Sequence, residues 1–151
     1  MYSILIVDDD NHDIQKVKTI IDHGAIPVDD LYTANNIQQA KEILSSRQID
    51  ILLCDIEMPQ GTGIELLEWG QERSQDTLSV LLTCHTDFKY ARQALRLGCI
   101  DYLLKPVDPK ELNSVLKKAE TVLKKKTETL RINDYQQMWK RITPLVMESF
   151  W

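Results

Sequence analysis

Long apolar runs, paired cysteines and an excess of basic residues are all absent from this chain of 151 residues. No segment approaches the roughly 20 consecutive apolar residues that a transmembrane helix needs, and the N-terminus lacks the basic segment and apolar stretch of a secretion signal. We therefore expect a cytoplasmic protein that does not associate with membranes. The net charge of −5 argues against a nucleic-acid-binding surface spread over the whole chain.

The three cysteines, Cys54, Cys84 and Cys99, are odd in number and include no pair with CxxC spacing. Such a set supports neither a disulfide framework nor a zinc site. We expect buried thiols that act as small hydrophobic side chains, which is the usual behaviour of free cysteine.

The composition is that of a globular protein, with 43% hydrophobic and 27% charged residues. The length suffices for one domain of ordinary size and an appendage. Charge is unevenly distributed, because residues 110–131 include seven basic and three acidic residues, a net charge of +4, and the rest of the chain carries −9. We interpret the basic stretch as a solvated helix face rather than a DNA contact.

Short apolar runs alternate with stretches of helical spacing. The runs, at residues 3–7, 31–34, 49–54, 78–83 and 100–104, are rich in aliphatic and β-branched residues and predict strands that are buried on both faces. Between the first two, the spacing of Ile14, Val17 and Ile21 predicts a helix. This alternation predicts an α/β protein with a five-stranded parallel sheet and helices on both sides, a doubly wound arrangement.

Polar residues follow the predicted strands at one end. Asp8 and Asp9 end the first strand, Asp55 the third, Thr83 the fourth and Lys105 the fifth. In an open parallel sheet these positions converge on the edge where ligands bind. Three carboxylates, a hydroxyl and an ammonium at one edge predict a site for a divalent cation and an oxyanion.

A helix is expected to begin at "VDPKEL", with Asp108 as N-cap, Pro109 at the first helical position and Glu111 completing a capping box. The predicted helix is longer than is needed to cover the sheet, and its apolar stripe is interrupted at residues 124–126. We therefore predict a domain over residues 1–125 and a C-terminal helical extension over residues 126–151.

Four motifs, "ILIVDDD", "LLCDIEMPQGTG", "VLLTCHTD" and "DYLLKPVD", together resemble the receiver domain of bacterial two-component response regulators over residues 1–125. The resemblance implies a flavodoxin-like sheet with strand order 2-1-3-4-5. It also implies a phosphorylation-dependent signalling switch that assists its own phosphorylation and dephosphorylation but is not a turnover enzyme.

The resemblance also implies a role for each matching residue. Asp55 would be the phosphoacceptor, and Mg²⁺ would be held by Asp8, Asp9, Asp55 and the main-chain carbonyl of Glu57. The remaining matches are Thr83, which would engage the phosphoryl group, Lys105, which would pair with it, Tyr102 as the switch aromatic, and Pro106 in a cis peptide. We expect Asp10 either to be solvated or to contact the metal ligands without binding the metal itself.

The partners implied are a sensor histidine kinase and, after phosphorylation, a second copy of the chain. The tail, with "DYLLKPVD", resembles the linker of AraC-type (YesN-like) regulators. This predicts that DNA is contacted only through a missing output domain that regulates transcription.

Two alternatives remain open. In a haloacid-dehalogenase-type phosphatase, Asp8 would be the nucleophile and Asp10 the general acid, although Asp55 would then have no role and a later acidic pair is missing. A receiver-like interaction module that is never phosphorylated is the other alternative. The filled key positions argue against it.

Overall fold

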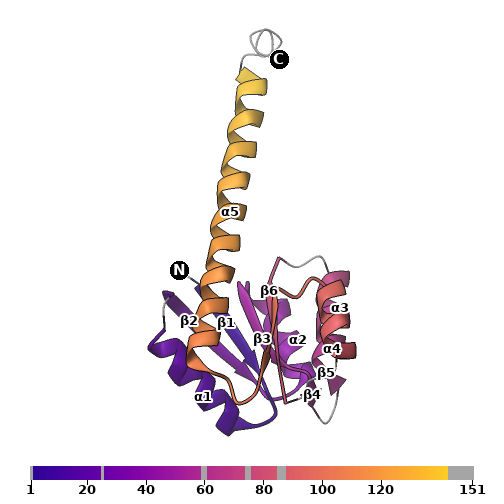
Figure 1. Cartoon of the computed structure of the whole chain (residues 1–151). Helices are drawn as coiled ribbons and strands as arrows, with labels where there is room; N and C mark the ends of the chain where they lie inside the picture. Colours follow the sequence, from indigo (N-terminus) through magenta and orange to yellow (C-terminus); the bar gives the residue numbers. More distant parts are fainter. Residues whose placement is uncertain (1, 25, 59–60, 74–75, 85–87, 143–151) are drawn as a thin grey trace. The chain divides into compact units, whose positions relative to one another are not determined.

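The computed structural model describes residues 2–24, 26–58, 61–73, 76–84 and 88–142, and only the backbone of residues 71, 88–91 and 126–142. Strands and helices alternate along these segments (Figure 1). In chain order they are β1 (Tyr2–Val7), α1 (Asn11–Asp22), β2 (Val28–Ala34), α2 (Ile37–Ser46), β3 (Ile51–Asp55), β4 (Glu57–Met58), β5 (Gly61–Thr62), α3 (Gly63–Glu72), β6 (Leu78–Thr83), α4 (Phe88–Arg96), β7 (Asp101–Leu104) and α5 (Pro109–Ile142).

Five strands form one parallel sheet in the order β2-β1-β3-β6-β7. Since β6 and β7 are its fourth and fifth strands along the chain, the predicted order 2-1-3-4-5 is confirmed. β4 and β5 form a separate antiparallel pair. This pair was not predicted, because two-residue strands are too short to show a period in the sequence.

Helices cover both faces of the sheet (Figure 1). Leu5 and Leu52 lie in a buried cluster with residues of α2, α3 and α4. Their neighbours Ile4 and Ile51 are also buried and face the opposite side, because successive side chains of a strand alternate. Helices α1 and α5 contribute the buried residues Ile14, Val17, Ile21, Leu112, Val115, Leu116 and Ala119 on that side.

The prediction that every strand is buried on both faces is wrong for the two edge strands. In β2 only Ala34 is buried, and Asp29 and Asp30 are exposed. In β7 only Leu103 is buried. An edge strand has a neighbour on one side only, so water reaches side chains that a central position would cover.

The starts of α1 and α5 are fixed by aspartate caps. The Asp10 side chain accepts a hydrogen bond of 2.8 Å from the His12 amide. The Asp108 side chain accepts one of 3.0 Å from the Lys110 amide, which confirms the predicted start of α5.

The contacts of the chain divide it into two units, Met1–Ala119 and Glu120–Trp151, and α5 continues through the boundary. In the second unit Lys124 Nζ lies 3.7 Å from Glu120 Oε1, one helical turn away. The predicted boundary after residue 125 stays a prediction, and residues 143–151 of the predicted extension lie outside the described residues. None of the described helices is both long and apolar enough to span a membrane.

Candidate functional site

Three carboxylates meet at the carboxyl ends of two central strands. Asp8 and Asp9 follow β1, and Asp55 is the last residue of β3, which pairs directly with β1. One ligand atom from each lies within 4.8 Å of the others. Asp8 and Asp55 are buried and Asp9 is exposed, so the cluster opens to solvent on one side. Carboxylate oxygens at this separation suit a small hard cation such as Mg²⁺, which also keeps several water ligands.

The loop after β1 fixes the orientation of Asp8. Asp8 Oδ1 accepts a hydrogen bond of 2.9 Å from the Asp10 amide. The Asn35 side chain, which follows β2, donates to the Asp8 carbonyl at 3.2 Å and to Asn11 Oδ1 at 2.6 Å. Asp10 therefore contacts the predicted metal ligand Asp8 through its amide, while its side chain caps α1. Contact with a metal ligand is one of the two roles expected for Asp10.

Lys105 follows β7 and extends into the same cluster. Its Nζ lies 2.6 Å from Asp8 Oδ2, 3.2 Å from Asp13 Oδ2 and 3.3 Å from Asp55 Oδ2. The side chain is only 11% exposed. The Lys105 amide donates to the Thr83 carbonyl at 2.7 Å, which continues the pairing of β6 and β7 beyond their ends. The peptide bond between Lys105 and Pro106 is cis.

Asp13 was not predicted as part of the site. It lies in the first turn of α1, and its ion pair with Lys105 joins residues 92 positions apart. In the sequence Asp13 is one more acid on an amphipathic helix, and most of the other polar residues of that helix are exposed. The only available signal was its position one helical turn beyond the acidic run.

Burial and neighbouring charges shift the pKa values of these groups in opposite directions. Burial raises the pKa of Asp55 to about 6, against the lowering effect of the Lys105 charge, and burial also raises the pKa of Asp8. For Lys105, burial opposes the charged form, but the hydrogen bond to Asp8 and the charges of Asp55 and Asp8 outweigh it and raise its pKa. Lys105 therefore stays positively charged at neutral pH, while Asp55, with its raised pKa, is half protonated near pH 6.

Thr83 and Tyr102 lie on neighbouring strands and face the same side of the sheet. Thr83 is the buried last residue of β6 and pairs with Leu104 of β7. Tyr102 is two residues before Leu104, so its side chain points to the same side as that of Thr83. The Tyr102 ring is partly buried against the core cluster.

The segment after β3 approaches Asp55 closely. The Glu57 amide donates to Asp55 Oδ1 at 3.3 Å, and the Glu57 side chain is exposed. A Cβ atom at Gly63 would lie 2.6 Å from the Asp55 carbonyl oxygen, so only glycine fits at the start of α3. Between Asp55 and Gly63 in the chain lies the β4–β5 ladder, in which Glu57 pairs with Thr62 and Met58 with Gly61.

Two of the three cysteines are buried as predicted. Cys54 and Cys99 lie in the core, where burial raises the pKa of both thiols. The prediction is wrong for Cys84, which is exposed. It follows the last residue of β6, where the chain leaves the sheet toward solvent.

A family model described as the response regulator receiver domain matches residues 4–117. The chain belongs to this family. Receiver domains are phosphoacceptor switches that bind Mg²⁺ through acidic residues and interact with histidine kinases. The cluster of Asp8, Asp9 and Asp55 is compatible with such a metal site. The family assignment favours a receiver over the phosphatase alternative, in which Asp8 would be the nucleophile.

Curated relatives and solved structures agree with this family. The response regulator protein PilR of Pseudomonas aeruginosa is 36% identical over 104 residues, which are 69% of this chain and 23% of PilR. The transcriptional regulatory protein HptR of Staphylococcus aureus is 30% identical over 116 residues, 77% of this chain and 45% of HptR. The chain thus spans less than half the length of these relatives. The REC domain of AraT, a response regulator from Geobacillus stearothermophilus, is 27% identical with a TM-score of 0.74, and the match covers 83% of this chain and 98% of the AraT chain.

Proposed function

We propose that this chain is the receiver part of a response regulator and that Asp55 accepts a phosphoryl group from a sensor histidine kinase. The observation that supports this most strongly is the position of Lys105. Its ammonium lies 3.3 Å from Asp55 Oδ2, beside a cluster of three carboxylates that could hold a cation. Phosphoryl transfer to aspartate requires a nucleophilic carboxylate and nearby positive charge that offsets the negative charge of the phosphoryl group.

In the proposed reaction an Asp55 oxygen forms a bond to the phosphorus, and the bond from phosphorus to the histidine nitrogen of the kinase breaks. The nitrogen keeps the electron pair, and Asp55 becomes an acyl phosphate. Mg²⁺, held by Asp8, Asp9, Asp55 and the main-chain carbonyl of Glu57, would neutralise the negative charge that donor and acceptor share. Lys105 contributes a charge that its neighbouring carboxylates hold in position.

The switch in this proposal consists of Thr83 and Tyr102. Phosphorylation adds negative charge and acceptor oxygens to Asp55, and the Thr83 hydroxyl would donate a hydrogen bond to one of them. A shift of Thr83 would alter the packing of Tyr102, which faces the same side of the sheet. Phosphorylation would thereby change the surface formed by α4, β7 and α5. Leu95 of α4 and Leu104 of β7 are exposed apolar side chains that would favour a homodimer through this surface.

The proposal extends to the longer protein. HptR, a transcriptional regulatory protein, is more than twice as long as the segment that matches this chain. We propose that the extension from residue 126 leads to an AraC-type output domain and that DNA is contacted only there. Free cysteines at positions 54, 84 and 99 are compatible with the reducing cytoplasm in which we place the protein.

Beryllofluoride, which mimics a phosphoryl group on a carboxylate, tests the proposed acceptor. Fluorine NMR of the chain with beryllofluoride and Mg²⁺ should show a bound signal, and the signal should vanish without Mg²⁺ or in Asp55→Asn. Asp29→Asn is the matched control and should keep the signal. It removes an exposed carboxylate near the start of β2, whereas the site lies at the carboxyl ends of the strands. No bound signal in the unaltered chain would support the interaction-module alternative instead.

A further inference from the structure

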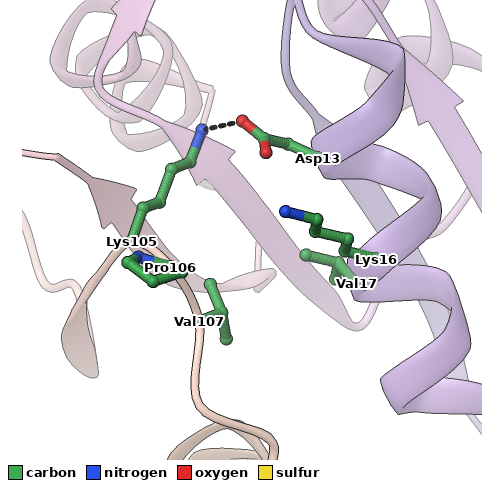
Figure 2. A pocket seen from close by; sticks show the side chains of 6 residues that line it. All are labelled: Asp13, Lys16, Val17, Lys105, Pro106 and Val107. Carbon is green, nitrogen blue, oxygen red and sulfur yellow. Dashed lines mark hydrogen bonds and ion pairs between the residues drawn. The ribbon is translucent and has the colours of Figure 1, made fainter.

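Lys105 has a carboxylate partner that lies outside the acidic cluster. Among the described residues the cluster comprises Asp8, Asp9 and Asp55. Asp13 approaches the ammonium from α1, with its Oδ2 3.2 Å from Nζ. Figure 2 shows the two side chains pointing toward each other across a small pocket, which is also lined by Lys16, Val17, Pro106 and Val107.

Mg²⁺ and Lys105 would compete for the same carboxylate groups. Asp8 and Asp55 each pair with the ammonium, and both belong to the cluster that would hold the cation. Any ion that draws these two carboxylates toward itself weakens their pairing with Lys105. An ammonium that is only 11% exposed would then be left without a close counterion, which is costly.

We infer that Asp13 is a positioning residue that keeps Lys105 paired when Asp8 and Asp55 turn to Mg²⁺. Asp13 lies outside the cluster, so its carboxylate stays available to the ammonium while the metal site fills. Its position is well defined, because Asp10 caps the helix turn that carries it. Asp13 thereby favours metal binding without being a ligand. The inference rests on the proposed function, since it assumes that the acidic cluster takes Mg²⁺.

A double-mutant cycle with the Mg²⁺ dissociation constant as its readout tests this coupling. In calorimetric titrations of the full chain with magnesium chloride, Asp13→Asn should weaken Mg²⁺ binding roughly three- to tenfold, the range expected for one partly buried ion pair. Lys105→Met should bind Mg²⁺ more tightly than the unaltered chain, because the competing ammonium is gone. In that background Asp13→Asn should change the affinity by less than about twofold.

Equal losses in both backgrounds would overturn the inference, because the missing negative charge alone would then explain the effect. No loss in the natural background would overturn it as well. Asp13→Glu, which keeps the charge, should restore the affinity to within about twofold of the unaltered chain. Asp22→Asn removes the same charge from the exposed far end of α1 and should leave the affinity unchanged.

The two levels of the proposal can fail separately. If the unaltered chain binds neither Mg²⁺ nor beryllofluoride, the proposed function fails. If it binds both and Asp13→Asn binds Mg²⁺ equally well, only the role of Asp13 is overturned. Unfolding temperatures of every variant without Mg²⁺ show whether each is folded before the affinities are compared.

Discussion

Replacing Asp55 by asparagine should stabilise the metal-free protein near neutral pH, although it removes the proposed phosphoacceptor. Burial raises the pKa of Asp55 from 3.8 to about 6. The folded state therefore binds the proton more tightly than the unfolded state does. The resulting contribution to stability is fully present below about pH 4 and is lost as the pH rises through about 6. Above that pH the folded protein holds an ionised carboxylate in an unfavourable site, and asparagine removes this cost.

The size of the effect follows from the shift. Each pKa unit corresponds to about 1.4 kcal/mol, so the full shift sets a ceiling of about 3 kcal/mol. The site opens to solvent beside Asp9, and water screens part of this energy. We therefore expect Asp55→Asn to raise the free energy of unfolding near pH 7 by on the order of 1–2 kcal/mol.

Urea unfolding of the chain and the variant with a chelator present, at several pH values, measures the difference. The gap should shrink toward zero as the pH falls below about 4, because Asp55 then becomes protonated in both states. Mg²⁺ should reverse the order, since a ligand at 100 times its dissociation constant stabilises the folded state by about 2.7 kcal/mol and the variant lacks one metal ligand. A variant that is equally or less stable near pH 7 without metal, or a gap that grows at lower pH, would refute this reasoning.

Three further predictions concern the frame of the site and its output surface. Gly63→Ala should cost on the order of 1–3 kcal/mol of stability in urea, because its Cβ would overlap the Asp55 carbonyl, whereas Gly70→Ala in the same helix meets nothing within 4 Å and should gain about 0.5–1 kcal/mol. Equal effects of the two would contradict the close approach. Asp10→Ala should lose about 1 kcal/mol with the helix cap, while Asp10→Asn, which can still cap, should lose much less. An equal loss in Asp10→Asn would assign the effect to charge. Leu95→Glu should prevent the dimerisation that beryllofluoride promotes, as sedimentation velocity would detect, and a beryllofluoride-treated natural chain that stays monomeric would contradict the proposed dimer surface.

The central sheet could be predicted from the sequence because its strands are continuous apolar runs. The run at residues 78–83 corresponds to β6, Leu78–Thr83, without a shift. At the edges the prediction was less accurate. The run at residues 31–34 gave only the second half of β2, because Asp29 and Asp30 interrupt the apolar pattern where the strand is exposed.

The acidic cluster could be predicted for a different reason. Parallel strands bring their carboxyl ends to one edge, so Asp8, Asp9 and Asp55 had to converge once the strands were assigned. The contact of Asp13 with Lys105 depends instead on where α1 begins and how it lies against the segment that follows β7, and no local pattern encodes a pair 92 positions apart. The exposure of Cys84 was missed because it depends on β6 ending at Thr83, which leaves Cys84 just outside the sheet.

Mapping of the phosphorylated residue tests the central claim most directly. The chain would be incubated with a small phosphodonor and Mg²⁺, digested, and analysed by mass spectrometry for the peptide that gains one phosphoryl group. We expect a single modification on Asp55 that requires Mg²⁺ and is absent from Asp55→Asn. A phosphoryl group on Asp8, or stable uptake that persists in Asp55→Asn, would contradict the account.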